Sequence, residues 1–293
     1  MIISVASGKG GTGKTTIAVN LALALAKDEE KNVQFLDCDV EEPNAHLFLE
    51  PVITNSESVE IPVPKINDKK CNYCGKCAEV CVFNAIAVTK NKVLVFPGLC
   101  HGCGACTLFC PEKAITEEGN EVGVLEEGKA GSINFTHGRL NIGEPMAPPI
   151  IRKIKKKINK DGTKGKNNDI TNHHITIIDA PPGTSCPVIE SIKDSDYTIL
   201  VTEPTPFGLH DLILAVEVLR KLKIPHGVVL NKCDIGDHKV EEYCKKNDIP
   251  LLLSIPLDRE IAVAYSKGIP IVKINPSYEQ KFIQLFQKIT QII

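Results

Sequence analysis

The amino-acid sequence predicts an α/β fold in which a mostly parallel sheet is flanked by helices and interrupted by a small α+β insert. Short apolar runs alternate with helical runs over much of the 293-residue chain, which is the pattern of βαβ units. A glycine-rich loop joins the first apolar run to the first helical run. Eight of the 12 cysteines lie between residues 71 and 110, so the insert is expected there.

Composition and charge narrow the classes of function. The formal net charge is −2, with 43% hydrophobic and 24% charged residues; these values exclude a disordered polyelectrolyte and give no basic excess for nucleic acid. No apolar run approaches the roughly 18 residues of a membrane span, and no secretory leader is recognisable. We therefore expect a cytoplasmic protein without a membrane partner. In that reducing compartment, many cysteines indicate metal ligands rather than disulfides.

The first strand, loop and helix predict a phosphate-binding loop. An apolar run at residues 2–5 precedes the loop and a helical run at 17–23 follows it. In the G-x4-G-K-T spacing, backbone amides can surround phosphates, Lys14 can neutralise the β- and γ-phosphates, and Thr15 can reach Mg²⁺. The alternative is a glycine-rich turn with an incidental lysine. The expected nucleotide ligands are Gly8, Lys9, Gly10, Gly11, Thr12, Gly13, Lys14, Thr15 and Thr16.

Lys9 makes this loop more specific. The stretch Lys-Gly-Gly-Thr-Gly-Lys-Thr-Thr resembles the deviant Walker A motif of the SIMIBI class of P-loop NTPases, the relatives of MinD, ParA, Mrp and the nitrogenase iron protein. The resemblance implies an ATPase that forms a dimer, either with a second copy or with a paralogue. It also implies that Lys9 acts on the γ-phosphate bound by the partner subunit, whereas the alternative is a solvated loop lysine.

Two acidic residues follow the next apolar run, at residues 33–36. A carboxylate at the end of a parallel strand beside a P-loop can hold a metal-bound water or position the attacking one. The stretch resembles the switch I segment of the same class. The resemblance implies that Asp39 orients the hydrolytic water, Asp37 supports Mg²⁺ and Asn44 senses dimerisation. Without it, the two acids could equally be capping or solvated residues.

A third landmark follows the insert. The run at residues 173–178 leads into Asp179-Ala180-Pro181-Pro182-Gly183-Thr184. A buried strand would bring Asp179 to Mg²⁺ through a water, and the amide of Gly183 would be free to bond the γ-phosphate and so report its presence. The segment resembles the switch II of Mrp-type relatives.

Further α/β units complete the nucleotide domain, with strands expected at 197–201 and 227–230 and a helix at 212–219. The last strand ends in Asn231-Lys232-Cys233-Asp234. The N-K-x-D spacing would suit guanine, but relatives with this Walker A motif use an Asn here for adenine, so we favour ATP. Pro256 and Asp258 resemble the class's purine-flanking segment.

The cysteines between residues 71 and 110 form two copies of one pattern, offset by 29 residues. Each copy has three cysteines at intervals of three and a fourth four residues later. Three such thiolates can bind one cubane while the fourth binds the other, so crossed ligation is expected. Cluster 1 would use Cys71, Cys74, Cys77 and Cys110, and cluster 2 would use Cys100, Cys103, Cys106 and Cys81. The insert resembles a bacterial-type two-[4Fe–4S] ferredoxin; the weaker alternatives are zinc and disulfides.

These motifs divide the chain into the first part of the ATPase domain at 1–60, the ferredoxin-like insert at 61–116 and the second part at 117–293. Prolines and serines predict a linker into the insert at about 51–64, and an acidic-to-glycine-rich passage at 117–131 is the expected way out. The layout resembles the MinD-superfamily ATPases that carry an inserted ferredoxin domain.

Two further features carry open alternatives. A basic run from Arg152 to Lys166 is interpreted as a solvated face or as a docking site for an acidic redox partner. Cys186 lies seven residues after Asp179, where the nitrogenase iron protein also has a cluster-ligating cysteine. That resemblance implies either a bridging third cluster or a packed thiol.

Together these features predict an ATP-hydrolysing dimer whose nucleotide state is coupled to electron transfer through two [4Fe–4S] clusters, with a redox protein as partner. The alternative is an Mrp-like scaffold or carrier that transfers clusters to an acceptor protein under ATP control. A third hypothesis, a cell-positioning ATPase, would need a membrane or DNA surface that the composition does not indicate.

Overall fold

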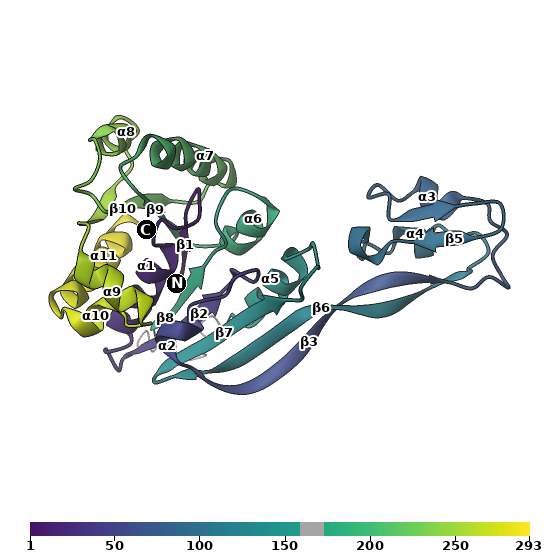
Figure 1. The fold of residues 1–293 in the computed structure, drawn as a ribbon, viewed down its shortest axis with the longest axis horizontal. Coiled ribbons are helices and arrows are strands. Elements are labelled where there is room, and N and C mark those ends of the chain that lie inside the picture. The colour runs from purple at the N-terminus through teal and green to yellow at the C-terminus, as the bar shows by residue number, and fades with distance from the viewer. Residues whose placement is uncertain (159–172) are drawn as a thin grey trace.

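The computed structural model describes residues 1–158 and 173–293, and in them a nine-stranded sheet forms the body of the molecule (Figure 1). The strand order is β11-β10-β9-β1-β8-β2-β7-β6-β3, parallel from β11 to β7 and antiparallel for β6 and β3. The strands are β1 (Ile2–Ala6), β2 (Lys31–Asp37), β3 (Val52–Ile66), β6 (Ile115–Ala130), β7 (Ile133–Leu140), β8 (His173–Asp179), β9 (Tyr197–Thr202), β10 (His226–Asn231) and β11 (Leu251–Ile255). The predicted α/β fold with a mostly parallel sheet is confirmed.

Helices cover both faces of the sheet, because its central strands are apolar on both sides. One face packs against α1 (Lys14–Leu25), α2 (His46–Leu49), α10 (Ile271–Ile274) and α11 (Ser277–Ile292). The other packs against α5 (Pro148–Lys155), α6 (Cys186–Ile192), α7 (Pro206–Leu222) and α8 (Lys239–Lys246). Helix α9 (Arg259–Ser266) lies beside α10. In the described part of the chain, no helix combines the length and apolar character needed to cross a membrane.

The register of the parallel strands gathers the predicted site residues at one edge of the sheet. Asp37 on β2 pairs with Asp179 on β8, which pairs in turn with Val5 on β1, just before the glycine-rich loop. In open α/β sheets, ligands bind at the carboxyl ends of the strands. The fold therefore builds its candidate nucleotide site there.

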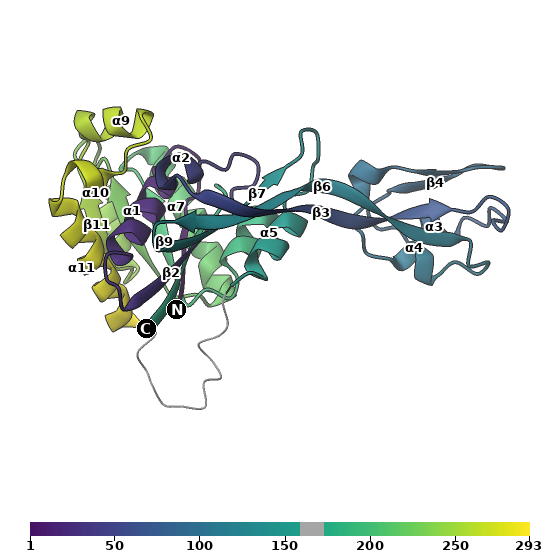
Figure 2. The same ribbon diagram turned by 90° about the horizontal axis from the view of Figure 1, so that it is seen from below.

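Strands β3 and β6 continue well past the end of the neighbouring strand β7. The segments that the sequence predicted to be linkers are therefore strands. Their pairing runs from Val52 opposite Lys129 to Ile66 opposite Ile115, whereas β7 accompanies β6 only up to Gly123. Beyond that point the two strands form a ribbon that holds residues 67–114 away from the body (Figures 1 and 2). Residues 51–64 and 117–131, predicted as connectors, are thus mostly strand, and both domain boundaries at 60/61 and 116/117 fall inside a strand.

Side-chain alternation explains why this stretch is a strand despite its prolines. Val59, Ile61 and Val63 are buried against the α5 side, while the residues between them are exposed. Pro62 and Pro64 cannot donate to a ladder, but β3 is the edge strand of the sheet, where a proline is tolerated.

Residues 67–114 form what we call the cysteine-rich lobe, and its two halves repeat each other. The lobe contains α3 (Lys76–Glu79), α4 (Ala105–Leu108), the hairpin of β4 (Ile86–Val88) and β5 (Val93–Val95), and the short turn η1 (Pro97–Leu99). Helices α3 and α4 are related by the 29-residue offset, as are three pairs of left-handed backbone positions: Tyr73 and Gly102, Gly75 and Gly104, Asn84 and Lys113. The internal duplication is therefore a duplication of backbone conformation.

The described part of the basic run lies at the surface and is largely paired with acids. Lys160, Lys164 and Lys166 lie outside the described residues. Of the described members, Arg152, Lys153 and Lys157 form partly exposed ion pairs with acids of the same chain, which is compatible with a solvated face. Lys156 is exposed.

Candidate functional site

The glycine-rich loop passes from β1 to the first turn of α1, which begins at Lys14. Gly13 has φ 94°, in the left-handed region that favours glycine, and a Cβ there would lie 2.6 Å from Nδ2 of Asn231. The left-handed backbone and the close approach of Asn231 both explain why residue 13 is a glycine. The N-terminal amides of α1 are thereby presented to the site as anion donors.

Lys14 lies between two of the predicted acids. Its Nζ donates to Oδ1 of Asp179 at 2.9 Å and approaches Oδ2 of Asp39 at 3.5 Å. Burial alone would lower the pKa of Lys14, but the carboxylates of Asp179 and Asp39 outweigh it and raise the pKa. Lys14 is therefore charged. A bound phosphate would compete with the two carboxylates for Lys14, and Mg²⁺ would compete with Lys14 for the carboxylates.

Asp37 supports the loop beside these acids. It is fully buried and accepts the amides of Asp39 and Ala45, each at 3.1 Å. Burial and the charge of Asp179 raise the pKa of Asp37 to about 8. Its oxygens are occupied by backbone donors, so it fits a role in holding the switch I turn and in acting on a metal through water.

Three polar atoms in the described part of the site are buried and lack a hydrogen-bond partner: Oγ1 of Thr12, Oδ1 of Asn44 and Oδ2 of Asp179. They come from the three segments that the sequence assigned to the nucleotide. Buried oxygens without partners are costly, and a Mg²⁺–nucleotide with its water ligands would satisfy them. The residues present therefore fit the expected ligand.

The amide of Gly183 is not free, contrary to expectation. It donates to the carbonyl of Ser7 at 2.9 Å. The physical reason is that Gly183, at φ 95°, directs its N–H toward the end of β1, which supplies a ready acceptor. A phosphate at this position would have to replace that carbonyl.

Glu203 is a site residue that the sequence reading missed. Its buried carboxylate accepts Nζ of Lys232 at 2.6 Å and lies 3.8 Å from Nζ of Lys9, whose side chain is 32% exposed. Glu203 therefore connects Lys9 of the glycine-rich loop with Lys232, which follows β10 in the segment expected beside the base. The available signal was its place immediately after the buried strand β9, at the carboxyl edge of the sheet.

The base-side residues are held by the protein itself. Nδ2 of Asn231 donates to the carbonyl of Thr12 at 2.9 Å, and Asp258 caps α9 by accepting the amide of Glu260. Asp234, the acid of the N-K-x-D spacing, accepts the amide of Leu257 at 2.6 Å. This bond uses only Oδ1 of an exposed carboxylate, so the contact does not discriminate between adenine and guanine. Pro256 lies exposed in the same turn.

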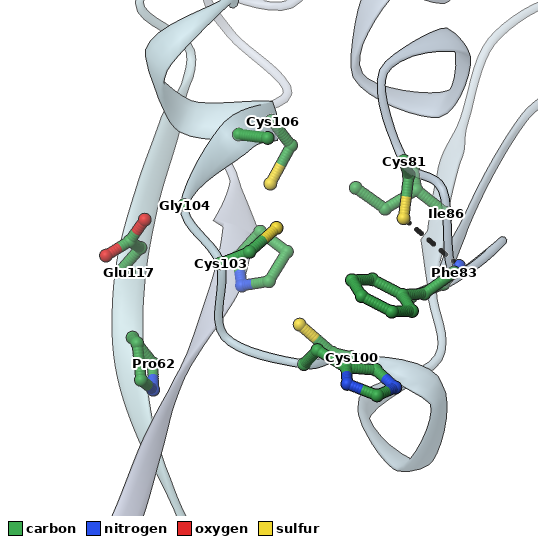
Figure 3. Close-up of a pocket in the computed structure, with 13 residues that line it drawn as sticks. Pro62, Cys81, Phe83, Ile86, Cys100, Cys103, Gly104, Cys106 and Glu117 are labelled. Atoms are coloured by element: carbon green, nitrogen blue, oxygen red, sulfur yellow. Dashed lines mark hydrogen bonds between the residues drawn. The ribbon is translucent and has the colours of Figure 1, made fainter. Parts of the chain in front are cut away.

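In the lobe, the cysteines divide between two pockets as crossed ligation requires. One pocket is lined by Cys81, Cys100, Cys103 and Cys106, whose sulfurs point toward a common space (Figure 3). The other is lined by Cys71, Cys74, Cys77 and Cys110. Among the described residues, no three Cys, His, Asp or Glu side chains converge on a single-ion site. Four sulfurs around a cavity suit a cubane, in which each thiolate binds its own iron, better than zinc.

Backbone amides point at four of these sulfurs in matched pairs. Cys71 and Cys100 accept the amides of Tyr73 and Gly102, at 3.4 and 3.5 Å. Cys81 and Cys110 accept those of Ala85 and Ala114, both at 3.3 Å. Amide donors stabilise negative charge on ligating sulfurs and tune cluster potentials.

The two halves differ in the side chains that cover them. Phe83 stacks on His101, with ring centroids 3.6 Å apart, at the pocket of Cys100. The residues related by the 29-residue offset are Glu112 and Asn72, which form a polar contact of 3.0 Å at the other pocket. The two halves of the lobe therefore share a backbone conformation but differ in the side chains that line their pockets.

Cys186 is the exposed first residue of α6, in the body and apart from the lobe (Figure 1). The structure does not bring it near the eight lobe cysteines. Cys38, Cys233 and Cys244 are buried or half-buried thiols.

Comparisons with known proteins identify the family and the fold of the chain. The CobQ/CobB/MinD/ParA nucleotide binding domain matches residues 3–271. An uncharacterized protein of Methanocaldococcus jannaschii is 33% identical over 94% of this chain and 93% of its own length. The iron-sulfur cluster carrier protein of Pyrococcus horikoshii is 27% identical, covering 98% and 84%. The septum site-determining protein MinD of P. horikoshii, complexed with Mg-ADP, has a similar fold, with a TM-score of 0.60 at 22% identity over 99% and 96% of the two chains.

Proposed function

The chain belongs to the CobQ/CobB/MinD/ParA nucleotide-binding family, and from that premise we propose that it is an ATP-hydrolysing iron–sulfur protein whose nucleotide state controls two [4Fe–4S] clusters. The observation that carries the proposal is the combination of a Lys14–Asp179–Asp39 site in the body with two four-cysteine pockets in the lobe.

Hydrolysis would use residues already in contact. Lys14 and the amides of the glycine-rich loop bind the phosphates, and Asp39 orients the attacking water. Thr15 and Asp179 would hold Mg²⁺, which supplies charge neutralisation between the β- and γ-phosphates. Lys9 would leave Glu203 and reach the nucleotide of a partner subunit, in a homodimer or a heterodimer with a paralogue.

Replacing Lys14 tests the nucleotide part. We expect Lys14→Ala to lower the ATP hydrolysis rate about 10²- to 10³-fold, because it removes the buried cation that balances developing phosphate charge. Lys156→Ala, at an exposed lysine, is the matched control and should hydrolyse ATP at the wild-type rate. Wild-type hydrolysis by Lys14→Ala would refute the assignment.

Iron analysis tests the lobe. We expect about eight irons per chain in anaerobically prepared protein, four for each cubane. Cys77→Ser and Cys106→Ser change one buried ligand in opposite sets, so each should reduce the iron of one cluster and spare the other. Iron above eight that falls on Cys186→Ala would support an additional cluster bridging two subunits; unchanged iron would reject it.

Two functions fit this description, and the comparisons favour the cluster carrier. Relatives that match nearly the whole chain bear the name iron-sulfur cluster carrier protein. A carrier would bind an acceptor protein and release a cluster under ATP control. Exposed Cys74 and Cys103, one in each set, would be the first ligands an acceptor thiol could displace.

Electron transfer to a redox protein is the second candidate. It is favoured by the closely matched pockets, each with four cysteines and paired amide donors, which suit retained clusters. The two functions predict different measurements. A carrier transfers iron and sulfide to an apo-acceptor with ATP-dependent loss of its own clusters; an electron carrier keeps its iron through repeated reduction and reoxidation followed by EPR.

A further inference from the structure

Helix α5 lies between the switch II region and the ribbon, and it packs directly on the sheet. Ile150, Ile151 and Ile154 are fully buried. The fit depends on small residues beneath the helix: a Cβ on Gly138 of β7 would lie 2.3 Å from Cγ2 of Ile150, and one on Gly123 of β6 would lie 2.6 Å from its Cδ1. Because α5 packs this closely on β6 and β7, a displacement of α5 would also displace these two strands.

The buried residues around α5 form one continuous apolar cluster. At one end it includes Ile178, which precedes Asp179, and Cys38, which lies between Asp37 and Asp39. At the other end it includes Val63 of the ribbon and Cys100 of the lobe. No solvent layer separates the nucleotide-site strands from the base of the lobe along this path.

Polar contacts fasten one edge of α5 to α6, the helix after switch II. Arg152 pairs with the carboxylate of Glu190 at 3.4 Å. Nζ of Lys155 donates to the carbonyl of Glu190 at 3.0 Å and to that of Lys193. Lys155 is mostly buried, so these contacts hold the helix ends together.

The end of the same helix, with Lys157 just after it, is fastened to β3 and β6 where these strands still lie in the sheet, next to the Val59–Gly123 pair at which the ribbon begins. Nζ of Lys153 donates to the carbonyl of Ser58 at 2.7 Å and lies 3.2 Å from the carboxylate of Glu57. Nζ of Lys157 bridges the carboxylates of Glu57 on β3 and Glu127 on β6, at 2.9 and 2.8 Å. Helix α5 and the turn after it thus hold both strands at the base of the ribbon, together with the helix after switch II.

We propose that α5 transmits nucleotide-dependent movement of switch II to the ribbon and so to the cysteine-rich lobe. The two states differ at Gly183, whose amide donates to Ser7 here and would turn to the γ-phosphate when ATP binds. The shift is passed from α6 to α5 through Arg152 and Lys155, and from α5 to the ribbon through Lys153 and Lys157. This inference rests on the proposed function, because it requires ATP binding, and it assigns that function its route of regulation.

Amide hydrogen exchange of the full, iron-loaded chain tests the route. Adding a non-hydrolysable ATP analogue with Mg²⁺ should change exchange by about fivefold or more in α6 and in the ribbon, at residues 60–66 of β3 and 115–122 of β6. In the double variant Lys153→Met/Lys157→Met, the change in α6 and the affinity for the analogue should persist, while the change in the ribbon should be lost.

Two further variants keep the test sharp. Lys156→Met alters the same charge at an exposed neighbouring lysine and should respond as wild type. Gly138→Ala should uncouple the ribbon without any change of charge, because its Cβ displaces α5. A wild-type ribbon response in the double variant, or no ribbon response in wild-type protein that binds the analogue and holds iron, would overturn the proposal. Failure to bind the analogue or to hold iron would instead contradict the proposed function.

Discussion

The body and the lobe stabilise their structures in different ways. The body has extended cores on both faces of its sheet, whereas the lobe has a small cluster in which Cys77, Ile86, Val93 and Cys106 pack with Ile115 of β6. Two of those five residues are candidate cluster ligands. A nucleotide is thus a ligand of a body that already has a core, but clusters would replace the core that the lobe lacks.

Removing iron is the strongest test of this contrast. After anaerobic chelation we expect amides of residues 67–114 to exchange more than about a hundredfold faster, because the cysteine pockets lose the group that joins them. Amides of β1, β8 and β9 should keep their protection, and ATP should still bind. A lobe that stays protected without iron would show that its own side chains suffice.

A smaller effect is expected on the pH dependence of the body's unfolding free energy. The pKa of Asp37 is raised to about 8 by burial, so the folded body holds a proton that the unfolded chain releases, and stability is lost as pH rises through that value. The nucleotide-free body should lose up to about 1.4 kcal/mol per pH unit of unfolding free energy between pH 6.5 and 8. Urea unfolding followed by circular dichroism measures this slope.

Asp37→Asn should flatten that slope, and so should Mg²⁺–nucleotide if it holds Asp37 ionised. Burial lowers the pKa values of His137 and His226, so their contribution is present above the usual histidine pKa and is lost at lower pH. The histidine contribution therefore has the opposite sign and cannot produce the expected loss above pH 6.5. An unchanged slope in Asp37→Asn would assign the dependence to another group, such as Asp39, whose pKa burial also raises.

The smallest expected effect compares the halves of the lobe. Gly75 and Gly104 have φ 81° and 72° at the starts of α3 and α4. Replacing either by Ala should destabilise its half by about 1 kcal/mol, because both need the left-handed region. The rate of iron loss from each variant measures this. Unequal effects would locate the asymmetry in the neighbours, since only Gly104 would meet Glu117, at 3.2 Å.

Local chemistry made part of the molecule predictable. The glycine-rich loop, Asp39 and Asp179 follow strands whose apolar runs are unmistakable, and parallel packing brings strand ends together. The spacing of the cysteines within each copy likewise predicted which of them share a pocket. Each inference needed only a short-range sequence pattern and the rule that the carboxyl ends of parallel strands lie at one edge of a sheet.

Long-range pairing could not be foreseen from the same patterns. The ribbon was missed because its exposed face and prolines resemble a linker, and its partner strand lies some fifty residues away with the lobe between them. Glu203 and the lysines of α5 acquire their roles from residues distant in sequence, such as Lys9 and Glu57. Charge composition alone does not identify such partners.

The pairing at the root of the ribbon has a consequence for how such a chain can be assembled. Val59 and Gly123 lie directly opposite each other, so everything between them enters and leaves the sheet at one point. A two-residue turn could close the same antiparallel pair. The cysteine-rich segment is therefore a topologically neutral insertion: it could be gained, lost or exchanged for another module while every hydrogen-bonded ladder of the host sheet stays as it is.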